Sequence, residues 1–207
     1  FLKTQGAGAN PIWADLGLAT DGWQAAGETW TYASVSSFTV TGDKTAKFRK
    51  GTRIKLDQSP GGTRYFYVKG SSYNGGSGLT TVNTTAGDAY TLVNAAITTP
   101  YYSYDANPQD FPDWFPFTPT WGGFSVNPNG TFRFRIDGYT CTFYYLPNTP
   151  GTSNATTFTF TLPVAPSFSL SNFGFCYVKD NSANQSAPGH MESTGLSTTV
   201  NVYKTFY

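Results

Sequence analysis

Hydrophobic and polar residues alternate along many short stretches of the chain, which predicts β-strands. In TRIKLDQ (52–58), Ile54 and Leu56 fall on one side and charged residues fall on the other. A period of two residues is the signature of a strand with one buried face, because successive side chains point to opposite faces of the sheet. The same alternation returns in GTFRFRID (130–137) and TTFTFTL (156–162). In each case we expect the apolar face to be buried and the polar face to lie in water.

The strand-like runs follow one another closely and are separated by segments that favour turns. Between residues 21 and 99 the runs are interrupted by TGDKT, SPGGT and YNGGSG. Short strands at this spacing predict a small β-barrel, because closing a sheet removes its exposed edges. Runs return over residues 122–207 and predict an antiparallel, jelly-roll-like β-sandwich. The expected fold class is therefore all-β.

Two segments do not fit this pattern. Residues 1–20 are small and polar with little core material, so we expect an extended segment in which Trp13 packs against a barrel or another copy. Residues 100–121 contain five prolines, each of which removes a backbone donor, and we expect a linker without regular sheet. The many aromatic residues of this linker, among them Trp114 and Trp121, carry too much apolar surface to remain in water. We expect them to pack between domains or between copies.

Composition agrees with a β protein and narrows the partners. Charged residues make up only 12% of the 207 residues and aromatic residues 17%, which disfavours a helical surface. The net charge of +1 creates no field that would select nucleic acid or acidic membranes. A basic run from Lys44 to Lys69 is typical of a solvated sheet face, with phosphate contact as the alternative. We expect no nucleic-acid partner, no membrane insertion and further sequence before Phe1.

Motifs for nucleophilic or metal catalysis are missing from the sequence. It contains no G-x-S-x-G, H-E-x-x-H or P-loop pattern. The single histidine, His190, falls in a predicted loop without metal-binding neighbours, and we expect it to be solvated. Cys141 and Cys176 each lie in a strand-like run, and whether they form a disulfide stays open. No cofactor and no metal are expected.

Carboxylates offer an alternative function. Asp105, Asp110 and Asp113 lie among aromatic residues, and sugar-cleaving enzymes place paired carboxylates beside rings that stack on sugars. The alternative hypothesis is therefore a carbohydrate-active enzyme or a carbohydrate-binding module that uses these residues. We favour the simpler interpretation that the three aspartates begin turns in a proline-rich connector.

Three stretches resemble proteins of bacteriophages. FLKTQGAGANPIWADL (1–16) is similar to the segment that precedes the carboxy-terminal domains of many tail fibres. DGWQAAGETWTYASVSSFTVTGDKTAKFRKGTRIKLDQ (21–58) resembles a module of tail and prophage proteins. TWGGFSVNPNGTFRFRIDGYTCTFYY (120–145) with ATTFTFTLPVAP (155–166) resembles the jelly roll of tumour necrosis factor and complement globular heads, a form that phages place at fibre tips.

The resemblance implies a structural, non-enzymatic protein of the phage tail that attaches the virion to its bacterial host. It implies a homotrimer beside other tail proteins, extracellular when mature, with a surface saccharide or surface protein of the host as target. The small residues near the amino terminus fit this, because they let chains approach closely around a threefold axis. Exposed tyrosines give large, rigid contact area, so the candidate receptor-binding residues in the distal sandwich are Tyr139, Tyr144, Tyr145 and Tyr177.

Overall fold

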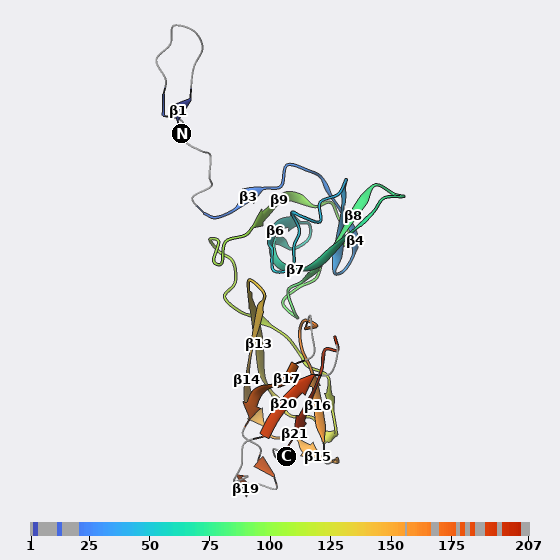
Figure 1. Cartoon of the computed structure of the whole chain (residues 1–207), viewed down its shortest axis with the longest axis vertical. Helices are drawn as coiled ribbons and strands as arrows, with labels where there is room; N and C mark the ends of the chain where they lie inside the picture. The colour runs from blue at the N-terminus through green and yellow to red at the C-terminus, as the bar shows by residue number, and fades with distance from the viewer. Residues whose placement is uncertain are drawn as a thin grey trace. The chain divides into compact units, whose positions relative to one another are not determined.

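The structure is a computed structural model that describes residues 2–3, 12–13, 21–155, 157–166, 170–176, 179–180, 183–184, 189–193 and 196–203. All regular structure in these residues is β-strand, and none of them is helical, which confirms the all-β fold class. The chain divides into two compact units (Figure 1). The first unit holds Phe1–Thr85 and Thr91–Asp113, and the second holds Ala86–Tyr90 and Trp114–Tyr207.

Two short strands lie within the first 20 residues. β1 (Leu2–Lys3) pairs antiparallel with β2 (Ile12–Trp13), with Leu2 opposite Trp13. This pairing brings the two dipeptides side by side, and the extended segment expected over residues 1–20 stays a prediction, since most of it lies outside the described residues. The Trp13 side chain lies outside the described part of the chain, and its packing role stays a prediction.

The first unit is built on one antiparallel sheet of seven strands in the order β3-β9-β6-β7-β8-β5-β4. The sheet curls strongly (Figure 1), and its edge strands are β3 and β4. No ladder joins these two edges within the described strands, so closure into a barrel stays a prediction. The strands are β3 (Gln24–Ala25), β4 (Trp30–Ser34), β5 (Ser37–Thr41), β6 (Arg53–Gln58), β7 (Gly62–Asn74), β8 (Leu79–Thr85) and β9 (Thr98–Ser103).

Three aromatic rings form the centre of the first unit's core. Trp30 of β4 stacks on Phe38 of β5 with ring centroids 4.4 Å apart. Phe48 meets Trp30 edge-on at 5.5 Å and Phe38 edge-on at 5.7 Å. All three rings are almost completely buried, as are Ile54 and Leu56. The apolar face that the alternation predicts for residues 52–58 therefore faces a core.

The opposite, charged face of β6 is partly covered, since Arg53 is buried while Lys55 and Asp57 are half-exposed, which corrects the expectation that Arg53 lies in water. Arg53 is only 3% exposed, and its guanidinium carbon lies 5.6 Å from the ring centroid of Tyr67 and 5.5 Å from that of Phe111. Trp23, before β3, packs on Phe111 with centroids 6.1 Å apart. Rings from three distant segments, Trp23, Tyr67 and Phe111, thus lie against this face, and alternation within β6 alone cannot indicate that.

Part of the proline-rich segment is regular sheet, which corrects the prediction of a linker without strands. β9 (Thr98–Ser103) contains Pro100 and pairs with both β3 and β6. Its register against β6 shifts between Lys55 and Asp57, next to Pro100. Because the ladder is irregular there, the missing proline donor is tolerated, while the Pro100 carbonyl accepts a bond of 2.9 Å from the Ala26 amide.

An aspartate at this irregularity makes the first unit sensitive to acid. Thr63 Oγ1 donates to Asp57 Oδ1 at 2.6 Å, and the Thr99 hydroxyl donates to Asp57 Oδ2. The bond from Thr63, followed by the bond from Thr99, lowers the pKa of Asp57 below its ordinary value. Since the folded pKa is lowered, the stabilisation is present above the unfolded pKa of about 3.9 and is lost as pH falls through the folded value.

We therefore expect Asp57→Asn to have a lower melting temperature than the wild type at neutral pH. Below about pH 4 the difference in melting temperature between the two proteins should become smaller, because the wild type then loses the same stabilisation. Melting curves recorded at neutral and acid pH measure this difference. Asp113→Asn, which removes a carboxylate at an exposed turn of the same unit, is the control. A difference for Asp57→Asn that stays constant with pH would contradict the account.

The second unit contains two larger antiparallel sheets and several short ribbons. One sheet has the order β10-β13-β14, and the other has the order β11-β16-β21-β20-β17, while β12 pairs with β15 and β18 with β19. Their bounds are β10 (Phe115–Pro116), β11 (Trp121–Gly122), β12 (Phe124–Val126), β13 (Asn129–Asp137), β14 (Thr140–Thr149), β15 (Thr152–Ser153), β16 (Phe158–Thr161), β17 (Leu170–Cys176), β18 (Lys179–Asp180), β19 (Ala183–Asn184), β20 (Gly189–Ser193) and β21 (Thr199–Tyr203).

Aromatic contacts join the two larger sheets into a sandwich. Phe143 of β14 meets Phe160 of β16 with centroids 5.8 Å apart. Phe160 is buried with Val200 and Val202 of β21, against which the other sheet packs. Trp121 of β11 lies 5.7 Å from Phe132 of β13 and adds a second bridge. The predicted antiparallel β-sandwich is confirmed.

A five-residue segment between β8 and β9 completes the second unit. The Asp88 amide donates to the Pro116 carbonyl at 2.8 Å, and the Tyr90 ring meets Phe115 at 6.4 Å. Gly87 has φ +58°, and a Cβ placed on it would overlap the Pro116 carbonyl oxygen and lie 2.8 Å from Phe134 Cε1. The backbone approach at this position therefore requires glycine.

Candidate functional site

The β13–β14 hairpin presents one apolar and one polar face, as its alternating sequence dictates. Phe132, Phe134 and Ile136 of β13 are buried inside the sandwich. Asp137 pairs with Thr140 across a two-residue turn in which Gly138 takes φ +58°. Glycine at the first turn position matches the twist of the strands and fixes the register. The residues between the buried ones therefore point away from the core.

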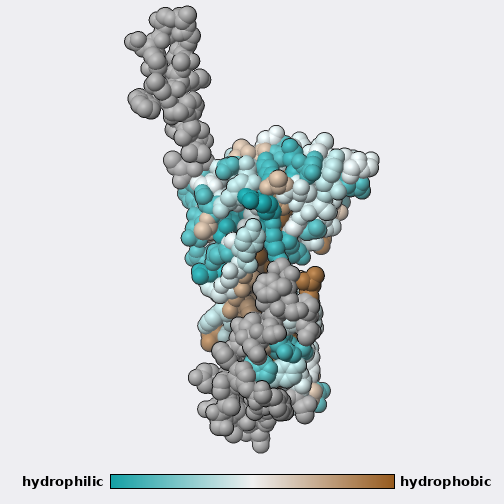
Figure 2. All heavy atoms as spheres, in the orientation of Figure 1, coloured by the Kyte–Doolittle hydropathy of each residue, from teal (hydrophilic) through white to brown (hydrophobic). Residues whose placement is uncertain are grey.

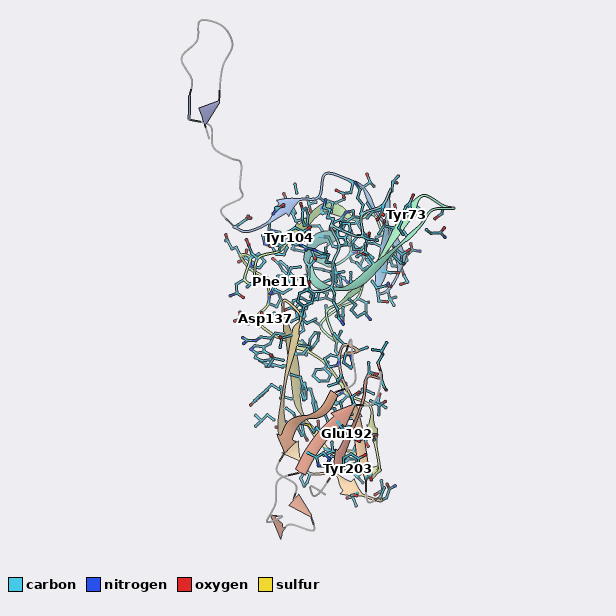
Figure 3. The ribbon with its side chains drawn as sticks, in the orientation of Figure 1. Tyr73, Tyr104, Phe111, Asp137, Glu192 and Tyr203 are labelled. Atoms are coloured by element: carbon cyan, nitrogen blue, oxygen red, sulfur yellow. The ribbon has the colours of Figure 1, made fainter. Side chains whose placement is uncertain are left out.

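We define the outer face of the hairpin as Arg133, Arg135 and Asp137 of β13 with Thr142 and Tyr144 of β14, together with Trp114. Within it, the Arg135 guanidinium carbon lies 5.0 Å from the Trp114 ring centroid. Arg135 Nε also contacts Asp137 Oδ2 at 3.2 Å. The Tyr144 ring lies 6.5 Å from Trp114. Figure 3 labels Asp137 at the end of β13.

The outer face offers aromatic and charged groups to solvent together. Tyr144 is 47% exposed, and Tyr139 in the turn is 90% exposed. Leu146, further along β14, is also exposed. Hydrophobic (brown) residues reach the visible surface of the second unit, whereas the visible surface of the first unit is mostly teal and white (Figure 2). Rings beside guanidinium and carboxylate groups can stack on a flat ligand and hydrogen-bond to its polar edge.

The predicted receptor-binding tyrosines do not form one set. Tyr139 and Tyr144 are exposed on the hairpin. Tyr145 points the other way and stacks on Phe132 with centroids 4.2 Å apart and ring planes 6° apart. Its burial raises the pKa of the Tyr145 phenol. Tyr145 therefore belongs to the packing of the sandwich, and Tyr177 lies outside the described residues.

The tryptophans predicted to serve in packing lie in two different environments. Trp121 lies among rings of the second unit, 5.5 Å from Phe124 and 5.7 Å from Phe160. Trp114 instead lies on the outer face, against Arg135 and Tyr144. Sequence reasoning missed the two arginines as site residues, although their alternation with buried phenylalanines marks them as outward-facing.

Comparisons with family models, with curated proteins and with solved structures find no match. The function is therefore inferred from the residues themselves.

No helix in the described part of the chain is long and apolar enough to cross a membrane. Nor do three or more His, Cys, Asp or Glu side chains gather, among those described, in a way that could hold a metal ion.

The three carboxylates of the alternative hypothesis lie in turns of the first unit. Asp105, Asp110 and Asp113 are all exposed, and Asp110 adopts φ +64°. The Asp105 backbone amide donates a hydrogen bond to Ser103 Oγ at 3.0 Å, which stabilises the turn. A general acid for glycoside cleavage needs surroundings that raise its pKa, typically an apolar pocket. The exposure of these three side chains means that none of them lies in an apolar pocket.

The basic run does not form one solvated stripe. Lys47 Nζ contacts Glu28 Oε2 at 2.8 Å and lies 4.2 Å from the Tyr102 ring centroid. Lys55 Nζ lies 5.3 Å from the Trp23 ring centroid, and Arg64 donates to the Pro60 carbonyl at 3.1 Å. Arg53 is buried as well, so several cationic side chains of this run contact groups of the first unit itself.

His190 lies in a strand, which corrects the prediction of a solvated loop. It belongs to β20, is half-buried and stacks on Tyr203 of β21 with centroids 4.8 Å apart. The Tyr203 hydroxyl donates to Glu192 at 2.7 Å, and these two side chains lie next to each other in Figure 3. This hydrogen bond raises the pKa of Tyr203. The histidine thus belongs to a small polar cluster on the five-stranded sheet.

Proposed function

We propose that this chain is a non-enzymatic attachment protein of a bacteriophage tail fibre, and that it binds the surface of the bacterial host. The observation that carries the proposal is the outer face of the β13–β14 hairpin, where Trp114 lies against Arg135 and Tyr144 lies opposite Arg133. Aromatic rings and arginine are the side chains most enriched in binding hot spots. The resemblance of three stretches of the sequence to tail-fibre segments supports the same function.

The scaffold under this face suits a binding surface. Phe132, Phe134 and Ile136 anchor β13 from below, so the outward side chains are mounted on a rigid strand. Arg135 contacts both the Trp114 ring and the Asp137 carboxylate. A site whose side chains are already ordered loses less conformational entropy on binding.

The test is binding of the purified chain to a panel of bacterial strains, followed by competition with their extracted surface glycans. We expect saturable binding to a subset of strains, because attachment requires a specific surface ligand. Competition by the glycan of a bound strain, and not of an unbound strain, would support a saccharide target. Absence of binding to every strain of a broad panel would contradict the proposal.

We further propose that three copies associate, since several weak contacts on one particle combine into strong attachment. Exposed Val126, Leu146 and Leu196 of the second unit offer apolar area that association would bury. Light scattering of the purified chain at micromolar concentration should give the mass of three protomers. A monomeric mass would contradict the proposed trimer but not the proposed binding face.

A further inference from the structure

Resting on the proposed attachment function, we propose that the ligand of the outer face is a saccharide that carries carboxylate groups. The face combines rings that stack on sugars with a cationic group that no carboxylate balances. Arg133 supplies this cationic group, because the other outward arginine of β13, Arg135, already contacts Trp114 and Asp137.

Arg133 and Arg135 differ in how their charges are used. Arg135 contacts the Asp137 carboxylate and the Trp114 ring. Arg133 is exposed, and no carboxylate of the described side chains forms an ion pair with it. The two arginines lie two residues apart on the same strand face. Arg133 therefore supplies one uncompensated positive charge at the surface.

The position of Arg133 places this charge beside an aromatic ring. Arg133 is directly opposite Tyr144 in the β13–β14 ladder. Residues opposite each other have Cβ atoms about 4.5–5.5 Å apart. A sugar ring stacked on the exposed Tyr144 would therefore bring a ring carboxylate within reach of the Arg133 guanidinium. The planar guanidinium pairs with a carboxylate through two parallel hydrogen bonds.

The charge balance of the face favours a carboxylate over a phosphate monoester. One unbalanced guanidinium matches the single charge of a carboxylate, whereas a phosphate monoester carries roughly 1.5 to 2 negative charges at neutral pH.

The experiment uses the surface polysaccharide of a strain that the chain binds, in three forms: native, with its carboxylates chemically reduced to alcohols, and dephosphorylated. Affinity is measured by calorimetry for the full chain, for Arg133→Gln and for Lys69→Gln. Lys69 is exposed in the first unit and is not one of the residues of the outer face, so its variant loses the same charge at a different position of the chain. Circular dichroism shows that each variant is folded.

We expect reduction of the carboxylates to weaken binding at least about 10-fold, dephosphorylation to leave it unchanged, and Arg133→Gln alone to reproduce the loss. The charge-assisted contact should also weaken with salt. Equal affinity for native and reduced glycan, loss on dephosphorylation, or an unchanged Arg133→Gln would overturn the carboxylate inference while attachment stands. Binding to cells that the extracted glycan does not inhibit would also overturn the carboxylate inference. Failure to bind any strain would remove the proposed function itself.

Discussion

Replacing Trp30 with alanine is expected to lower the free energy of unfolding of the first unit by about 3–5 kcal/mol. Trp30 is 2% exposed, stacks on Phe38 and meets Phe48 edge-on. Its removal leaves a cavity between Phe38 of β5 and Phe48, two rings that are fully buried and packed against each other, so they cannot readily collapse into it. Denaturation followed by circular dichroism measures the change, and amide exchange assigns it to β4 and β5.

Two further variants control this prediction. Trp30→Phe keeps a ring in the stack, and no acceptor among the described residues is lost because Nε1 of Trp30 makes no hydrogen bond to them. It should therefore cost much less than Trp30→Ala. Val35→Ala, at an exposed position of the same unit, should change stability by at most about 0.5 kcal/mol. A Trp30→Ala protein as stable as Val35→Ala would contradict the proposed core.

Gly87→Ala is expected to destabilise the second unit by about 2–5 kcal/mol, combining a left-handed backbone cost with steric overlap. Gly87 has φ +58°, and an added Cβ would overlap the Pro116 carbonyl oxygen and crowd Phe134. Because Pro116 also accepts the Asp88 amide, relief of the overlap would break that bond. Chemical denaturation, with amide exchange of β10 and β13, measures the loss.

Gly138→Ala is the matched control for this substitution. Gly138 lies in the same unit and has the same φ of +58°, but a Cβ there would meet nothing within 4 Å. It should show only the backbone cost, about 1–2 kcal/mol. The difference between the two variants isolates the steric part. Equal losses would show that the close approach at Gly87 is not real.

The local pattern of the sequence predicts individual strands well because a strand's period is a property of neighbouring residues. Phe132, Phe134 and Ile136 are buried as their alternation with arginines predicts. Strand β9 could not be predicted from its proline, since tolerance of Pro100 depends on a register shift against β6 that only the assembled sheet contains. Pro116 is tolerated because β10 is an edge strand of its sheet.

Side-chain environments that distant segments create could not be predicted from the local pattern either, because they too depend on the assembled fold. The alternation predicts a solvated Arg53, whereas Tyr67 and Phe111 cover it in the folded sheet. The candidate site was predicted in part: Tyr139 and Tyr144 are exposed, whereas Tyr145 packs inward. Trp114 reaches the outer face from beyond the hairpin, so its place beside Arg135 depends on tertiary structure alone.

The most direct test of attachment through the outer face compares two similarly exposed tyrosines. Tyr144 is 47% exposed on the outer face and Tyr73 is 43% exposed on β7 of the first unit (Figure 3). The measurement is binding of Tyr144→Ser and Tyr73→Ser proteins to cells of a strain that the wild type binds. We predict that Tyr144→Ser loses affinity at least about 10-fold while Tyr73→Ser binds like the wild type. Unchanged binding by Tyr144→Ser, or an equal loss in both, would contradict the account.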